Sequence, residues 1–74
     1  MKTRIHAVAE LVYGNIVITS YTLPNGTTLP VDRSFYGGTA VIGDEEMRRF
    51  EVVTGTNRRF LYLDDDGRWF VVRS

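Results

Sequence analysis

Residues 58–73 read RRFLYLDDDGRWFVVR, and this stretch indicates the fold class more directly than any other part of the chain. Two runs rich in aromatic and β-branched residues, 58–63 and 68–73, flank the polar residues 64–67. Such runs favour strands, and a tight polar segment that ends in glycine between two of them predicts a hairpin. We therefore expect the closing segment to be two antiparallel strands joined by a four-residue turn.

Apolar side chains occupy both faces of this predicted hairpin. One face would carry Phe60, Tyr62, Trp69 and Val71, and the other Leu61, Leu63, Phe70 and Val72. An antiparallel sheet with one face in water normally alternates apolar and polar residues, and a chain of 74 residues has length for one core only. Either the barrel encloses the second face or another chain covers it. We expect the first set to be a contact surface for a protein partner or a homodimer.

Alternation and turn residues extend the strand pattern to the amino terminus. Residues 3–13 alternate cleanly and predict a long first strand. Gly14-Asn15 predicts a tight hairpin turn into a second strand at residues 16–23. The turn residues Pro, Asn and Gly within 24–27 then lead to a short strand at 28–31.

The middle of the chain is less regular. Residues 32–38 show neither helical nor strand periodicity, which predicts an irregular loop before a strand at 39–42. Residues 44–49 place acids before arginines at i, i+4 spacing, in the sense that suits the helix dipole. One or two helical turns are expected there, and strands resume at residues 50–54.

Together these elements predict an all-β domain spanning residues 1–74. Val, Ile and Thr supply 21 residues and the aromatic residues nine more, a composition typical of pleated surfaces. Five to six short strands with at most one short helical turn suggest a small antiparallel barrel or strongly bent sheet, SH3-like first and OB-like second. Its core is expected to include Leu11, Ile18, Val52, Leu61 and Phe70.

Charge and cysteine content exclude several classes of protein. Nine Lys and Arg balance nine Asp and Glu, so a broad electrostatic attraction to nucleic acid is not expected. The absence of cysteine excludes disulfide scaffolds and cysteine-based zinc sites. No run of 18 apolar residues occurs and the first ten residues alternate, which predicts a cytoplasmic protein without a membrane segment.

Catalytic and metal-binding motifs are not recognisable in the sequence. His6 is the only histidine, and no second imidazole, cysteine or spaced carboxylate accompanies it. Residues 64–67 lack the ligand spacing of a calcium loop. Gly37-Gly38 lack the spacing of a phosphate-binding loop. We therefore expect no enzymatic activity, no cofactor and no metal.

Four arginines flank aromatic residues of neighbouring predicted strands. They are Arg48, Arg49, Arg58 and Arg59. Basic and aromatic side chains together suit single-stranded nucleic acid, although nearby acids can neutralise these arginines and protein interfaces have the same composition. A third alternative is a pocket for a small anion near Arg33 and Tyr36.

The favoured interpretation is a non-enzymatic protein-binding module, such as a small regulator or inhibitor of a host or partner protein. The alternative, from a different functional class, is a nucleic-acid-binding small β-barrel that uses the arginine and aromatic side chains. Light scattering for self-association, a shift assay with single-stranded oligonucleotides across salt, and a pull-down from lysate distinguish the two.

Overall fold

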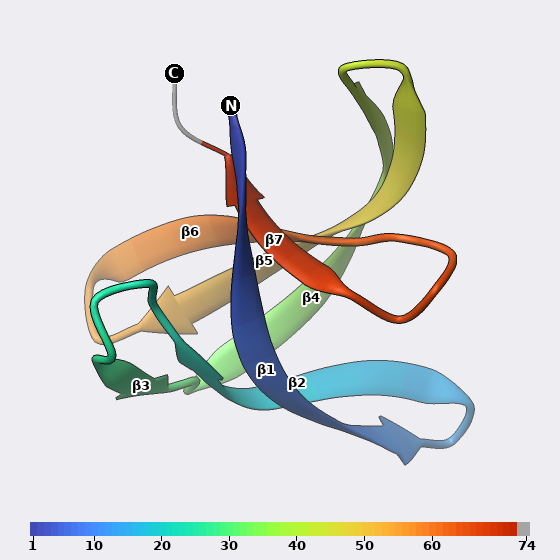
Figure 1. The fold of residues 1–74 in the computed structure, drawn as a ribbon. Helices are drawn as coiled ribbons and strands as arrows, with labels where there is room; N and C mark the ends of the chain where they lie inside the picture. The colour runs from blue at the N-terminus through green and yellow to red at the C-terminus, as the bar shows by residue number, and fades with distance from the viewer. Residues whose placement is uncertain (73–74) are drawn as a thin grey trace.

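The computed structural model describes residues 1–72, which form one antiparallel sheet of seven strands (Figure 1). The strands are β1 (Lys2–Val12), β2 (Asn15–Thr22), β3 (Thr28–Pro30), β4 (Arg33–Ile42), β5 (Glu45–Thr54), β6 (Asn57–Leu63) and β7 (Trp69–Val72). Their order across the sheet is β3-β2-β1-β7-β6-β5-β4, so the first strand lies beside the last. The sheet curls into a half-barrel whose two edges are β3 and β4.

The predicted all-β architecture is confirmed, with seven strands instead of five or six and no helix in the described residues. The helical turn predicted for residues 44–49 is wrong. Asp44 belongs to a two-residue loop, and residues 45–49 form the first half of β5. This strand pairs with β4, beginning with the pair Ile42 and Glu45. Pairing on both sides of β5 outweighs the weak helical preference of the spaced charges, because tertiary context overrides local propensity.

The irregular loop predicted for residues 32–38 is also wrong, since most of it is β4. The register between β4 and β5 shifts between Tyr36 and Thr39. Gly38 adopts φ +80° within this shift, a backbone conformation that glycine tolerates without steric cost. A bulge of this kind interrupts the two-residue period of a strand, which explains why the sequence pattern failed to show one.

The hairpin between β1 and β2 turns one residue earlier than predicted. Val12 pairs with Asn15, so the loop consists of Tyr13 and Gly14. Their φ values are +51° and +81°, the two positive values of a type I′ turn. Both strands of this predicted hairpin are confirmed, and the predicted Gly14-Asn15 turn is shifted by one position.

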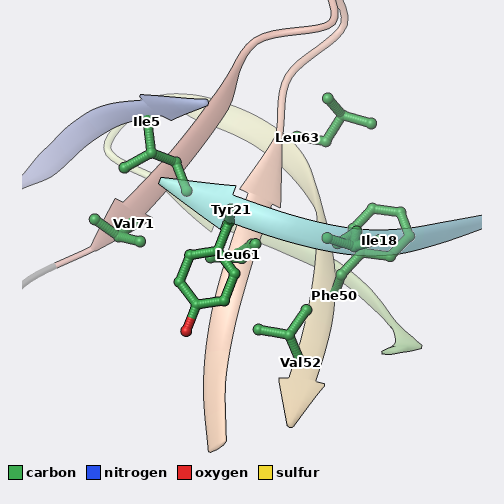
Figure 2. Close-up of a cluster of buried hydrophobic side chains, with 8 residues drawn as sticks. All are labelled: Ile5, Ile18, Tyr21, Phe50, Val52, Leu61, Leu63 and Val71. Atoms are coloured by element: carbon green, nitrogen blue, oxygen red, sulfur yellow. The ribbon is translucent and has the colours of Figure 1, made fainter. Parts of the chain in front are cut away.

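The main core lies on the concave face of the curled sheet (Figure 2). Its buried members are Ile5, Ile18, Tyr21, Phe50, Val52, Leu61, Leu63 and Val71. Of the predicted core residues, Ile18, Val52 and Leu61 are therefore confirmed. Leu11 is not a core residue, because it lies near the hairpin tip and stays 74% exposed.

Phe70 is buried, but it lies on the convex face, because the β6–β7 hairpin has a different register from the one predicted. Tyr62 pairs with Phe70 and Leu63 pairs with Trp69, so Trp69 shares a face with Leu63 and not with Tyr62. Five residues separate Leu63 from Trp69, one more than in the predicted turn. An extra residue in a turn moves every side chain of the following strand to the opposite face. The predicted strand 68–73 is observed as β7, and Arg73 lies outside the described residues.

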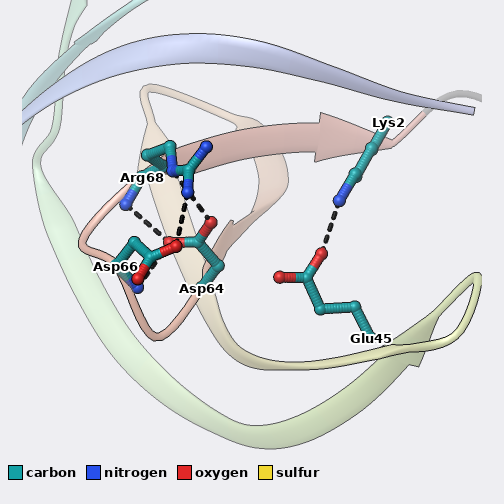
Figure 3. Close-up of polar contacts among 5 residues, drawn as sticks. All are labelled: Lys2, Glu45, Asp64, Asp66 and Arg68. Carbon is teal, nitrogen blue, oxygen red and sulfur yellow. Dashed lines mark hydrogen bonds and ion pairs between the residues drawn. The ribbon is translucent and has the colours of Figure 1, made fainter.

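The longer turn depends on the buried carboxylate of Asp64 (Figure 3). Its Oδ1 accepts hydrogen bonds from the backbone N–H of Asp66 at 3.0 Å and of Arg68 at 2.8 Å. The Arg68 guanidinium lies 3.4 Å from Oδ2 and also pairs with Asp66. Burial opposes ionisation, but these hydrogen bonds and the charges of Arg68 and Lys2 outweigh it and lower the pKa of Asp64.

This lowered pKa predicts a specific loss of stability in acid. A carboxylate with a depressed folded-state pKa stabilises the fold above its ordinary value of about 3.9, and the contribution disappears as the pH falls through the folded-state pKa. We expect Asp64→Asn to lower the urea midpoint at pH 7, and the gap from the unsubstituted protein to narrow below about pH 4. Asp65→Asn, at an exposed neighbouring position, should leave the midpoint unchanged. A difference in urea midpoint between Asp64→Asn and the unsubstituted protein that stays constant from pH 7 to pH 2 would contradict the lowered pKa of Asp64.

Candidate functional site

The half-barrel has an open seam between β2 and β4. β3 pairs with β2 only over Ser20–Thr22, and β4 pairs with β5 on one side only. The seam is bridged where the backbone N–H of Ile18 donates to Ser34 Oγ at 3.3 Å. Beyond this bridge the β1–β2 and β4–β5 hairpins diverge, and their tips lie well apart (Figure 1).

A groove of about 680 Å³ occupies the seam where the strands diverge. Most of its lining is apolar, from Leu11, Ile16, Val17, Phe35, Tyr36 and Phe50. Arg48 is the one charged residue among the described residues that line it. The volume lies within the range of ordinary ligand pockets, about 300–1,000 Å³, so the groove is large enough to hold several side chains of a partner.

Large apolar side chains surround the groove and remain in contact with solvent. Leu11 and Tyr13 on the β1–β2 hairpin are 74% and 100% exposed, and Phe35 and Tyr36 on β4 are also exposed. Tyr36 is held edge-on against the buried Phe50, with ring centroids 5.5 Å apart. Monomeric soluble proteins rarely gather exposed apolar residues in one place unless the place binds something. This surface, the seam site, is defined by Leu11, Tyr13, Phe35, Tyr36 and Arg48.

Tyr13 is retained at a backbone position that disfavours it. Its φ of +51° falls in the left-handed region, which costs an ordinary residue about 1–2 kcal/mol. Asn is the residue that type I′ turns prefer at this position. Because the ring is fully exposed, burial of the ring does not offset the backbone cost. A strained residue whose side chain serves no packing role points to a function outside the fold.

We expect Tyr13→Asn to stabilise the protein by about 1 kcal/mol, because asparagine adopts left-handed backbone at little cost. For a domain of this size that gain raises the thermal midpoint by about 4–8 °C. Circular dichroism during heating measures it. Thr56→Asn is the matched control, because Thr56 also sits in a two-residue hairpin loop but lacks a positive φ, and its midpoint should not rise. An unchanged or lowered midpoint for Tyr13→Asn would show that the turn carries no strain.

Two of the predicted arginines, Arg48 and Arg49, lie on opposite faces of β5. Arg48 lines the groove on the concave side. Arg49 is on the convex side, where its Nε and Nη2 donate to the carbonyl oxygen of Gly37 at 3.2 and 3.0 Å. Its guanidinium also lies 5.2 Å from the centre of the Phe60 ring. These two arginines therefore cannot act on one ligand surface together.

The other two arginines, Arg58 and Arg59, separate in the same way on β6. Arg58 lies on the convex face, 3.9 Å from the carboxylate of Glu51. Arg59 lines a smaller cavity of about 170 Å³ near the β2–β3 turn. Arg33 shares the convex face with Arg58, since both are paired with Val53. The convex face thus holds Arg33, Arg49 and Arg58.

The predicted contact surface of the final hairpin is likewise divided between the two faces. Val71 is in the core, and Trp69 packs against the core with its ring 5.4 Å from Phe50. Phe60 and Tyr62 lie on the convex face, where Phe60 is 44% exposed and Tyr62 is half-buried. The four residues do not form one surface.

Metal-binding clusters were not found in the part of the chain that the structure describes. Within residues 1–72 no three His, Cys, Asp or Glu side chains are grouped so that they could hold a metal ion. His6 of β1 pairs with Thr22 of β2, and its side chain lies on the face opposite the core residue Ile5. No helix of residues 1–72 is long and apolar enough to cross a membrane.

Sequence reasoning named two residues of the seam site, Tyr36 and Arg48, but for an anion or nucleic acid. It missed Leu11, which was placed in the core, and it missed Tyr13 and Phe35. A usable signal was present at Tyr13, because Tyr-Gly stands where the hairpin pattern favours Asn-Gly. For Phe35 the bulge in β4 concealed the alternation that would have placed it.

Comparison with protein-family models, curated proteins and solved structures gave no match to this chain. The SH3-like and OB-like labels therefore stay predictions.

Proposed function

We propose that the protein is a non-enzymatic protein-binding module whose binding surface is the seam site. One observation carries the proposal: three large exposed side chains, Leu11, Phe35 and Tyr36, line a single groove in a chain of 74 residues. The fully exposed Tyr13 adjoins Gly14, which also lines the groove. An exposed apolar surface of this kind typically marks an interaction site. Aromatic residues and arginine are also the residue types enriched at protein interfaces.

Two features of the site support binding by preformed anchors. Tyr36 is oriented by its contact with the buried Phe50, and rigid aromatic anchors lose little conformational entropy when they bind. Tyr13 projects from a tight turn, which fixes its backbone. A small regulator or inhibitor that occludes a surface of a host or partner protein suits such a site. A cytoplasmic location belongs to the same proposal and rests on the sequence alone.

Site-specific photo-crosslinking tests the proposal. A benzophenone amino acid replaces Tyr13 or Tyr36, and for the control it replaces Thr27, which is exposed in the β2–β3 turn. After irradiation in an extract of the cells that make the protein, we expect discrete adducts from the two tyrosine positions and none from position 27. An adduct of twice the chain mass identifies a homodimer formed through the seam. Identical products from all three positions would overturn the proposal.

The convex face supports a second candidate, the binding of single-stranded nucleic acid. Phe35, Glu51 and Phe60 pair in one row across β4, β5 and β6, and both phenylalanines are exposed. Arg49 and Arg58 lie on the same face, beside this row. Exposed aromatics beside arginines suit base stacking and phosphate contact. Glu51 in the middle of the row opposes phosphate, which makes this the weaker candidate.

Nucleic-acid binding on the convex face is expected to be weak and steeply dependent on salt. With at most three phosphate contacts, the logarithm of the affinity should fall with a slope of about −2 against the logarithm of the salt concentration. Fluorescence anisotropy with a labelled oligothymidylate measures this slope. A nanomolar affinity at physiological salt, lost in Arg58→Ala and kept in Arg59→Ala, would make nucleic acid the first choice.

A further inference from the structure

We propose that the seam is filled by an extended segment of a partner protein, which pairs as an added strand with the free edge of β4. This inference rests on the proposed function and specifies the mode of binding and the chemistry of the partner. It commits to a partner strand with apolar side chains at alternate positions and one carboxylate placed at Arg48.

The backbone groups of β4 alternate between those that face β5 and those that face the seam. Thr54 and Asn57 close a two-residue loop, so they are a hydrogen-bonded pair between β5 and β6. Because such groups alternate along a strand, the N–H and C=O groups of Phe50 and Val52 also face β6. Tyr36 and Ser34 are the partners of Phe50 and Val52 on β4. The backbone groups of Ser34 and Tyr36 must therefore point away from β5, into the seam.

The opposite wall of the seam presents backbone groups as well. The N–H of Ile18 faces the seam, because it donates to Ser34 Oγ. By the same alternation, the N–H and C=O of Ile16, two residues earlier, face the seam in the groove. β3 does not cover this position, since it pairs with β2 only from Ser20 onward. Two strand edges thus face one groove, which is the template for strand addition.

The lining of the groove specifies the side chains of the incoming strand. Phe50, Leu11 and Ile16 form an apolar floor and wall, so the side chains that point inward should be apolar. Arg48 is exposed at the same groove, and no carboxylate lies within 4.0 Å of it in residues 1–72. A carboxylate at one inward position would pair with it. Charge complementarity thus selects an acidic partner strand over a neutral one.

The bulge in β4 limits how a strand can pair with this edge. The register shift between Tyr36 and Thr39 bends the edge, and bulges are a common device against indiscriminate pairing. The segment Arg33–Tyr36 before the bulge remains regular, and its residues 34–36 line the groove. We therefore place the added strand against Tyr36, beyond the bridge between Ser34 and Ile18.

The test uses random decapeptides displayed on phage as the probe, selected on the immobilised protein. We expect enriched sequences that alternate apolar and polar residues, with Asp or Glu at one apolar-face position. A synthetic peptide of the enriched sequence should bind at least tenfold more weakly to Arg48→Glu than to the unsubstituted protein. Arg59→Glu, an equal charge reversal at the other cavity, should leave the affinity unchanged. Circular dichroism verifies that both variants fold.

Two further measurements address strand pairing directly. Bound peptide should slow the hydrogen exchange of the Ile16 and Tyr36 amides by tenfold or more, and methylation of the peptide's backbone nitrogens should abolish binding. Failure to enrich any peptide, a peptide bound as a helix, or binding that survives backbone methylation would overturn the inference.

The outcomes also separate this inference from the proposed function. If positions 13 and 36 give crosslinks but the crosslinked partner does not protect the Ile16 and Tyr36 amides, the proposed function stands and strand insertion fails. Absence of both crosslinks and peptides would remove both proposals, and a crosslinked homodimer would replace the partner strand by a second copy.

Discussion

Replacement of Leu61 by alanine is expected to lower the free energy of unfolding by about 3 kcal/mol, within the range of about 2–5 kcal/mol for buried leucines. Leu61 is 0% exposed and pairs with Phe50 across β5 and β6, so the lost side chain leaves a cavity in the middle of the core. In a domain of this length such a loss lowers the thermal midpoint by about 12–24 °C. Chemical and thermal unfolding, monitored by circular dichroism, measure both quantities.

Leu11→Ala is the matched control, because it removes the same atoms from a side chain that is 74% exposed. Surface changes of this kind usually stay within about 0.5 kcal/mol. Equal losses for Leu61→Ala and Leu11→Ala would mean that the hairpin tip packs into the core and that the seam is closed. The pair of variants therefore tests the core and the exposure of the candidate site together.

The second large effect is expected from Phe70→Ala, on the convex face. Phe70 is only 8% exposed, and the Lys2 ammonium lies 4.8 Å from its ring centre. Lys2 is held there by Glu45, with 2.6 Å between Nζ and Oε1 (Figure 3). We expect a loss of about 3 kcal/mol, at the lower end for buried phenylalanines, because a surface side chain can partly collapse into the space.

Phe60→Ala provides the comparison for this second prediction. Phe60 lies on the same face and the same hairpin, but it is 44% exposed and is covered in part by Arg49. Its removal should cost about 1 kcal/mol, which urea titration can separate from the larger loss. A smaller loss for Phe70 than for Phe60 would contradict the burial of Phe70 on the convex face.

Strand positions could be predicted from alternation and turn residues, but side-chain faces could not. The strands at residues 3–13, 16–23 and 58–63 are found within a residue or two of their predicted limits. The faces of β7 were wrong because the turn before it has five residues, and that length depends on the two backbone hydrogen bonds to Asp64. A sequence pattern shows that a turn is present but does not show which groups the buried carboxylate will bind.

The candidate site was harder to predict for a different reason. The seam exists because β3 is three residues long and leaves residues 15–18 of β2 without a strand partner on the side opposite β1. Periodicity reports which face of a strand is apolar, but it does not report whether two strand edges will meet. Leu11 looked like a core residue because it belongs to the apolar face of the first strand. It is exposed because the groove separates it from β4.

The pairing of β1 with β7 has a consequence for how the chain folds. Lys2 pairs with Val72, so this part of the sheet joins residues from opposite ends of the sequence. The β1–β2 and β4–β5–β6 hairpins form from neighbouring segments, whereas the β1–β7 ladder must close a loop of nearly the whole chain, and such closure is slow. During synthesis, one edge of β1 therefore stays without its partner until the last strand has left the ribosome. Until that moment the nascent chain carries two unjoined parts of the sheet, β3-β2-β1 and β6-β5-β4, each with an exposed strand edge.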